Sequence, residues 1–313
     1  MVREVRAAAP LMADLAAPAP ARGPWLTAAL NAQPSGPLRR VRPRAVVVQR
    51  DPQGRPDGLA LLSCRRRGAA TAVTLLGAGP EAAPLPDGRP AARLYARDDE
   101  AARLLAEGVA DLLDRLRAPW TLRLAGLPLG DPTVRHLAAL MPDSSLATSR
   151  SRLLVDELDT VGTVQRTRHP AEVERRLPDL LARVPAERRT AVRAAVRLHA
   201  AIGELELAVV PGPDGPAAVL LTLLDRGPAG EQRWPWWGVS DVGGLRRELG
   251  SPSVTLTAAA GLGRLGRSGA ARGLSRGAAA GCPRGRSSSV RCPGRSARRR
   301  PRACRRPAGR RPR

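Results

Sequence analysis

The 313-residue chain contains no lysine and no phenylalanine, and only one isoleucine, one tyrosine and one asparagine. Codons for these five amino acids all need A or T in their first two positions. Their shortage, beside abundant Ala, Arg, Gly, Pro and Leu, indicates a gene from a high-GC bacterium. All 52 basic residues are arginine for the same reason, so arginine content alone says little about function.

Long apolar runs and paired cysteines are also missing. No run of about 18 uncharged apolar residues exists, which excludes a membrane span and a membrane partner. Pro10, Asp14, Pro18 and Pro20 interrupt the start of the chain, so no secretory signal is expected and the predicted location is cytoplasmic. The four cysteines form no CxxC pair, and the three histidines (His136, His169 and His199) share no ligand spacing, so no metal site is predicted.

The charge is concentrated at the C-terminus. Residues 258–313 carry 17 arginines and no acid, which leaves +7 of the net +24 for the rest of the chain. Those 56 residues are almost all Ala, Arg, Gly, Pro, Ser or Cys, the residues that GC-rich DNA encodes in a wrong reading frame. We expect a disordered tail, because it cannot bury enough apolar surface to offset its chain entropy. Two hypotheses stay open for it, nonspecific polyanion binding and a frameshift that truncates the protein.

The remaining sequence predicts a mixed α/β fold with a mixed sheet. Apolar alternation predicts strands at 44–50, 59–64, 71–76, 120–125, 151–158, 204–210, 217–224 and 233–239. Helical spacing predicts helices at 98–116, 131–140, 170–184 and 186–202, and a turn entering a further helix at 250–257. We divide the chain into a flexible leader (1–24), a first half (25–150), an incomplete second half (151–257) and the basic tail (258–313).

Several polar and aromatic groups have both a functional and a structural interpretation. Arg189, Arg193 and Arg197 form a stripe that suits an anion, but a solvated helix face is the favoured interpretation. Glu204 and Glu206 suit a general base, although the water-facing side of a strand explains them better. A packed position is expected for His199 on its helix.

The aromatic residues Trp234, Trp236 and Trp237 suit either a ligand wall or an interface between halves. Neighbouring residues on a strand face opposite sides, so we expect Trp236 and Trp237 to diverge. At Gly250-Ser251-Pro252, backbone amides before a helix would suit a phosphate, and a plain capping turn is the commoner alternative.

Taken in order, these segments resemble the GNAT-type acyltransferases. The resemblance rests on the strand patterns RAVVVQR, GLALLSCR and TAVTLLG, the helix DDEAARLLAEGVADLLDRL, the strand WTLRLAGLP, the Arg-rich helix AERRTAVRAAVRLHAAIG, the aromatic strand WPWWGVSD and the turn GSPSVTLT. It is strongest for the double-domain branch related to cellulose-biosynthesis acetyltransferases, and it spans about residues 38–257.

This resemblance implies two GNAT-like halves, an acetyl-CoA or other acyl-CoA co-substrate and a small-molecule amine acceptor. It also implies that the CoA pyrophosphate binds Gly250, Ser251, Pro252 and Ser253. No residue of this sequence matches a catalytic base of the family. The sequence therefore predicts an acyl-CoA-dependent N-acyltransferase-like protein whose second half is truncated. The alternatives are a nucleic-acid-binding protein acting through its tail and a non-catalytic scaffold.

Overall fold

A computed structural model describes residues 1–32, 41–52, 54–79, 82–116, 119–213, 215–227 and 230–261. The predicted disordered tail falls almost entirely outside these described residues. All of these described residues belong to one compact unit.

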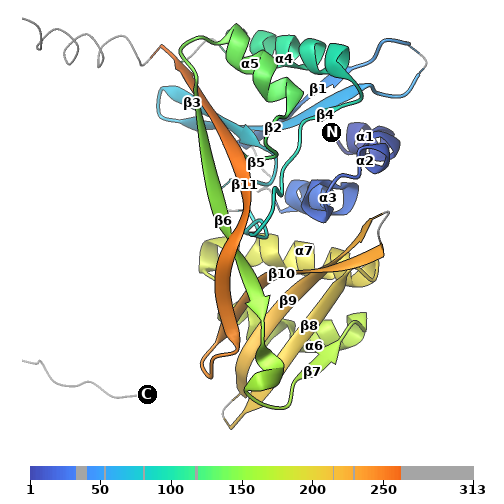
Figure 1. The fold of residues 1–313 in the computed structure, drawn as a ribbon, viewed down its shortest axis with the longest axis vertical. Helices are drawn as coiled ribbons and strands as arrows, with labels where there is room; N and C mark the ends of the chain where they lie inside the picture. The colour runs from blue at the N-terminus through green and yellow to red at the C-terminus, as the bar shows by residue number, and fades with distance from the viewer. Residues whose placement is uncertain are drawn as a thin grey trace, which may run out of the picture. The chain divides into compact units, whose positions relative to one another are not determined.

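Two sheets and several helices make up this unit (Figure 1). The helices are α1 (Val2–Ala7), α2 (Ala9–Asp14), α3 (Gly23–Asn31), α4 (Asp99–Asp114), α5 (Pro132–Leu140), α6 (Pro170–Ala182) and α7 (Arg189–Ala201), with short 3-10 turns η1 (Ala19–Ala21), η2 (Leu158–Thr160) and η3 (Ala186–Arg188). The strands are β1 (Val41–Val48), β2 (Gly58–Arg67), β3 (Ala70–Leu75), β4 (Tyr95–Ala96), β5 (Trp120–Leu127), β6 (Ser145–Asp156), β7 (Gln165–Thr167), β8 (Leu205–Gly212), β9 (Gly215–Gly227), β10 (Gly230–Ser240) and β11 (Leu245–Ala260). The predicted mixed α/β class is confirmed.

The first sheet has the order β1-β2-β3-β5-β11-β6, and β4 pairs with β2. The β3–β5 pair is parallel and the other described pairs are antiparallel, so the sheet is mixed. Helices α4 and α5 cover one face and bury a core with Leu62, Val73, Leu122 and Leu256. Helix α4 begins where its sequence predicts, because the Asp98 carboxylate caps it by accepting from the Ala101 amide at 2.8 Å.

The second sheet has the order β10-β9-β8-β7 and its described pairs are all antiparallel. Helices α6 and α7 pack on one face of it, around Val192, Val196, Leu207 and Leu221. The opposite face of β8 and β9 is covered by the end of β6, where Leu154 and Leu158 contact Ala208 and Leu220. Both faces of β8 are therefore buried.

Residues 1–24 differ from the predicted flexible leader. Helices α1 and α2 pack with α3 on the face of β2 opposite α4, where Val5, Leu11 and Met12 meet Leu59 and Leu61. These apolar side chains are at most 5% exposed. Residues 1–24 are ordered because their apolar side chains cover the face of β2 that α4 does not cover. Both faces of β2 are therefore buried.

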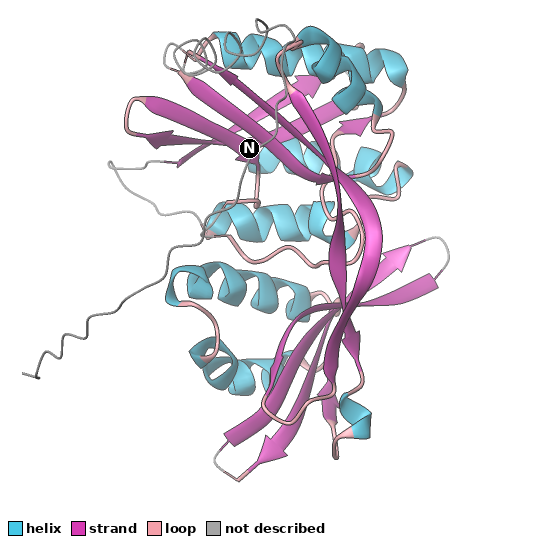
Figure 2. Ribbon diagram, turned by 60° about the vertical axis from the view of Figure 1, so that its left-hand side comes forward, coloured by secondary structure: helices cyan, strands magenta, loops and turns pink. Residues whose placement is uncertain are grey.

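The β6–β11 pair differs most from expectation. Residues 250–257 form part of strand β11, and not a helix, because β11 inserts between β5 and β6 of the first sheet. Figure 2 shows this pair as a long two-stranded ribbon. The predicted division between residues 150 and 151 falls inside β6, so one continuous strand belongs to both halves.

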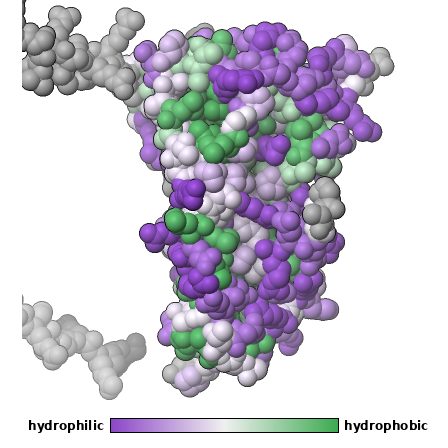
Figure 3. Space-filling view, viewed as in Figure 1, coloured by the Kyte–Doolittle hydropathy of each residue, from purple (hydrophilic) through white to green (hydrophobic). Residues whose placement is uncertain are grey.

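The surface is mixed in polarity. In Figure 3, hydrophobic residues form separate patches among hydrophilic ones on the face shown. No helix among the described residues is both long enough and apolar enough to cross a membrane.

Candidate functional site

The candidate site is a cavity of about 450 Å³ beside the one parallel strand pair of the described sheets. Strands β3 and β5 pair from Thr71 and Trp120 to Thr74 and Arg123, and no pairing continues beyond that point. Ligands of α/β sheets commonly bind outside the carboxyl ends of parallel strands. The cavity lies at this end, where the two strands part.

The floor of the cavity is a polar face of the first sheet. Arg123, Ser149, Ser253 and Thr255 line it from β5, β6 and β11, and all carry odd numbers. The even-numbered neighbours Leu122, Leu124, Val254 and Leu256 point the other way, into the core under α4 and α5. The alternation of a strand therefore gathers hydroxyl and guanidinium groups on the face that α4 leaves uncovered.

Two of these floor residues have unused polar groups. Ser253 is only 8% exposed, and its hydroxyl makes no hydrogen bond with a described residue. Arg123 is exposed, and no described carboxylate pairs with its guanidinium. Arg188, half-buried at the start of α7, adds a second guanidinium to the lining. The cavity is therefore suited to an anionic ligand.

A glycine turn closes the carboxyl end of β3. The Ala78 amide donates to Leu75 O at 3.1 Å, and Gly77 has a φ of +83°, as position i+2 of a type II turn requires. Gly77, Ala78 and Gly79 all line the cavity. The amides of Gly77 and Gly79 donate to no described backbone carbonyl, so they remain available to an anion. The sequence analysis missed this Gly-Ala-Gly turn, although its position directly after a predicted strand was visible.

Residues 82–94, called the connector below, form the wall opposite the floor. The Trp234 and Trp236 indole N–H groups donate to Asp87 O at 2.7 Å and to Pro84 O at 2.5 Å. Gly88 is bound on both sides, because its N–H donates to Ser151 Oγ at 2.8 Å and its carbonyl accepts from the Ser251 amide at 2.7 Å. The connector is thus fixed to both sheets.

Arg89 fixes the connector further. Its guanidinium lies 3.9 Å from the Trp234 ring centroid and donates to Asp225 Oδ2 at 2.7 Å and to Gln232 Oε1 at 2.8 Å. Desolvation lowers the pKa of Arg89, and the Asp225 carboxylate partly offsets that effect. Arg89 is therefore a structural member of the wall.

Asp87 is the one carboxylate among the described lining residues. Desolvation raises its pKa, while Arg247, whose Nη1 lies 3.6 Å from Asp87 Oδ2, acts in the opposite direction. The Asp87 side chain is 53% exposed and lies beside the cavity, so its carboxylate is accessible as a proton acceptor.

The four residues predicted to bind a pyrophosphate lie in β11 around a bulge opposite β6. A Cβ on Gly250 would lie 2.3 Å from Gly88 O, so glycine is needed there for the close approach of the connector. The Ser251 amide is already bonded to Gly88, and Pro252 has no N–H. Ser253 is the member of this set that lines the cavity.

The tryptophans lie between the two halves. A bulge between Pro235 and Trp237 inserts Trp236 as an extra residue opposite β9. Trp237 therefore packs on the same core as Trp234 and Trp236, and the expectation that Trp236 and Trp237 diverge is wrong. Proline explains the bulge, because it has no N–H to give to the strand ladder.

The other candidates lie away from the cavity. Glu206, expected on a water-facing side, is 4% exposed and has Arg166, Arg168 and Arg233 within 3.5 Å of its carboxylate. The stripe on α7 is a solvated face, because Arg197 pairs with Glu174 on α6 and Arg189 donates to Val184 O.

His199 is fully buried beside Trp25, as its packed position predicts. The described residues contain no cluster of three His, Cys, Asp or Glu side chains arranged to hold a metal ion.

Comparison with known proteins gives structural likenesses alone. No protein-family model matches the sequence, and the search of curated proteins finds no match. A tandem GNAT protein from the clavulanic acid biosynthesis pathway, without AcCoA, is similar over 83% of this chain and 95% of that chain, with 15% identity and a TM-score of 0.37. A conserved protein of unknown function from Bacteroides thetaiotaomicron is similar over 75% and 89% of the two chains, with 9% identity and a TM-score of 0.40.

Proposed function

We propose that this chain is an acyl-CoA-dependent N-acyltransferase-like protein, and that the cavity beside β3 and β5 takes the phosphate-bearing part of the acyl donor. The observation that carries the proposal is the cavity lining, in which guanidiniums, unused amides and hydroxyls face a single carboxylate. The resemblance of the sequence to GNAT-type enzymes supplies the kind of donor.

In this proposal the lining residues have separate roles in binding the phosphate and in accepting a proton. Arg123 balances part of the phosphate charge, while the Gly77 and Gly79 amides and the Ser253 hydroxyl donate hydrogen bonds to phosphate oxygens. When bound, an acyl-CoA supplies an activated thioester to an amine. Asp87, the one carboxylate among the described lining residues, accepts the proton that the amine loses.

The sequence assigned phosphate binding to Gly250, Ser251, Pro252 and Ser253. In the present proposal Ser253 keeps that role, since it lines the cavity and its hydroxyl makes no hydrogen bond with a described residue. For Gly250, Ser251 and Pro252 phosphate binding stays a prediction.

One observation favours a second candidate, the non-catalytic scaffold. The Ala92 amide donates to Gly126 O at 3.1 Å, so the connector runs along β5 where β3 has ended. Backbone therefore takes space that a donor between the two strands would need. A scaffold would keep the fold and the connector without binding any acyl-CoA.

Titration with acetyl-CoA decides between the two candidates. The acyltransferase proposal expects the melting temperature to rise with acetyl-CoA concentration, because a ligand that binds the native state stabilises it. Arg123→Gln should weaken binding about tenfold, since each 1.4 kcal/mol of lost interaction is a factor of ten. Arg197→Gln, at an exposed arginine outside the cavity lining, is the control and should leave affinity unchanged.

Absence of any shift at saturating acetyl-CoA would reject the acyltransferase proposal and leave the scaffold. If binding occurs, Asp87→Asn should lower the rate of acyl transfer and remove the acidic limb of its pH profile. Acyl transfer that keeps its pH profile in Asp87→Asn would exclude Asp87 as the base.

A further inference from the structure

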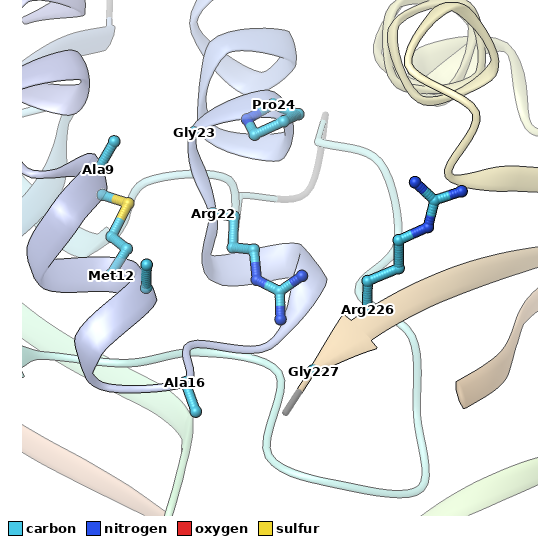
Figure 4. Close-up of a pocket in the computed structure, with 9 residues that line it drawn as sticks. Ala9, Met12, Ala16, Arg22, Gly23, Pro24, Arg226 and Gly227 are labelled. Carbon is cyan, nitrogen blue, oxygen red and sulfur yellow. The ribbon is translucent and has the colours of Figure 1, made fainter. Parts of the chain in front are cut away.

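A second cavity, of about 400 Å³, lies between the N-terminal helices and the end of β9. Figure 4 shows its lining, with α2 on one side, the start of α3 above and Arg226 of β9 on the other side. It shares no lining residue with the cavity beside β3 and β5. Its volume is in the range of small-molecule sites.

One side of this cavity is apolar. Ala9, Met12, Ala13 and Ala16 follow one face of α2 and its end, and Pro24 continues the apolar surface onto α3. Ala9, Ala13 and Ala16 are exposed, while Met12 below them is 2% exposed. Small side chains over a buried methionine leave room for an aliphatic chain along the helix.

The rest of the lining is cationic. Arg22 and Arg226 come from different elements and lie on opposite sides of the opening, and no acid is among the described lining residues (Figure 4). The Arg22 Nε donates to Ala17 O at 2.6 Å, and its Nη2 lies 2.9 Å from Asp225 Oδ1. Nη1 of Arg22 has no described partner and remains available to a ligand.

Arg226 is held still more weakly. Its side chain is 59% exposed, its Nε lies 3.5 Å from Glu231 Oε2, and its Nη2 reaches Gly203 O at 3.4 Å. Glu231 is closer to another guanidinium, Arg168, at 3.0 Å. Asp225 is likewise shared between Arg22 and Arg89. The carboxylates that pair with the two lining arginines, Asp225 and Glu231, therefore each serve two guanidiniums, and positive charge is in excess around these pairs.

We propose that this second cavity binds an amphipathic carboxylate, a single negative charge on a short unbranched aliphatic chain. Arg22 and Arg226 hold the carboxylate from two sides, as charge-assisted hydrogen bonds favour. The alanine face of α2 and Pro24 cover the chain and remove its apolar surface from water. This site is independent of the acyl-CoA proposal, because the two cavities have separate linings.

The test is a calorimetric titration of the full chain with octanoate below its micellar concentration. We expect octanoate to bind, and octanol and acetate to bind at least tenfold more weakly, because one lacks the charge and the other the chain. Arg226→Gln should weaken octanoate binding about tenfold, and Ala13→Leu, which fills the apolar face without altering any charge, should weaken it similarly. Arg197→Gln, at an arginine that is 56% exposed and outside this lining, is the matched control.

Arg226 is exposed and Ala13 lies on a helix surface, so both variants are expected to fold, which circular dichroism and the melting temperature check. Equal binding of octanol and octanoate would overturn the carboxylate assignment. Octanoate binding that neither Arg226→Gln nor Ala13→Leu changes would place the ligand elsewhere and overturn the site. Octyl phosphate is titrated in the same way. If it binds more tightly than octanoate, the head group that the site prefers is a phosphate and not a carboxylate.

Discussion

Asp225 is a buried carboxylate that joins the N-terminal helices, the connector and the second sheet. It is 7% exposed and lies within 3 Å of Arg22 and Arg89. Removing one partner of a buried ion pair leaves the other charge without compensation, which typically costs 3–5 kcal/mol. We expect Asp225→Ala to lower the free energy of unfolding by about 3 kcal/mol.

Urea denaturation monitored by tryptophan fluorescence measures this loss, because Trp234 stacks under Arg89. Glu174→Ala, at the exposed Glu174–Arg197 pair, is the control and should cost less than about 1 kcal/mol. Similar losses in the two variants would show that Asp225 contributes no more than a surface charge.

Cys64 is a buried thiol with a pKa that desolvation raises and Arg44 lowers only in part. Less thiolate is present at neutral pH, so Cys64 should react slowly with thiol reagents. We expect Ellman's reagent to modify it far more slowly in the folded protein than in urea. The experiment uses the Cys282→Ser, Cys292→Ser and Cys304→Ser background, in which Cys64 is the single thiol.

The raised pKa also predicts how stability depends on pH. Because the folded state disfavours the thiolate, the free energy of unfolding should fall as pH rises past the ordinary pKa of a cysteine, and Cys64→Ala should remove that dependence. Rapid modification of the native protein at neutral pH would contradict the buried, protonated thiol.

At the scale of residues, the sequence predicted those side-chain positions that depend on the local sequence pattern. His199 was assigned to a packed position from its helix face, and the helix at 98–116 was predicted from its apolar spacing. Glu206 was misplaced because the end of β6, distant in sequence, covers the second face of β8. Arg123, Ser149 and Thr255 were not recognised, since nothing local shows that three separate strands bring them together.

At the scale of elements, the crossing of the connector over β11 depends on two glycines. A Cβ on Gly250 would lie within 2.7 Å of three backbone atoms of Gly88, and backbone cannot move aside as a side chain can. Gly250→Ala should therefore lower the free energy of unfolding by roughly 2 kcal/mol or more. Gly227→Ala is the control, because a Cβ there meets no atom of a described residue within 4 Å.

Thermal unfolding of both variants measures the effect. An unchanged melting temperature in Gly250→Ala would show that the connector does not cross β11 as closely as described. Acetyl-CoA titration of the same variant also tests the predicted phosphate role of Gly250 separately from its packing role.

Most helices and strands were predicted because their apolar periodicity is clear. The β1–β2 hairpin, α4, α5, α6 and α7 lie within a few residues of their predicted ranges. Strand β11 was mistaken for a helix start, since Gly-Ser-Pro is typical of a capping turn and its partners β5 and β6 lie far away in the sequence. Helices α1 and α2 were missed because their Ala- and Pro-rich sequence resembles a flexible segment.

At the scale of the whole molecule, the separation of charge predicts that the C-terminal arginines bind DNA and that the rest of the chain keeps its stability without them. Seventeen arginines without an acid should bind phosphate backbones nonspecifically, with affinity that falls steeply as salt rises. We expect a chain that ends at Gly261 to lose binding to single- and double-stranded DNA while its melting temperature stays unchanged. Filter binding at several salt concentrations measures the first effect.

If the shortened chain keeps its affinity for DNA, the binding surface lies in residues 1–261, and Arg123 and the arginines around the second cavity become the first candidates. Reading the source DNA in all three frames tests the frameshift hypothesis separately, because an intact neighbouring frame should encode amphipathic strands or helices after Thr257.

The sequence by itself determined the mixed α/β class, most element positions and the split between a mildly basic body and an arginine-rich C-terminus. These depend on composition and on periodicities of two and 3.6 residues, which are local properties. Only the tertiary structure decided that β11 joins the first sheet, that the connector holds both sheets, and that two cationic cavities form. Each of these needs contacts between residues far apart in the chain, whose pairing no local pattern specifies.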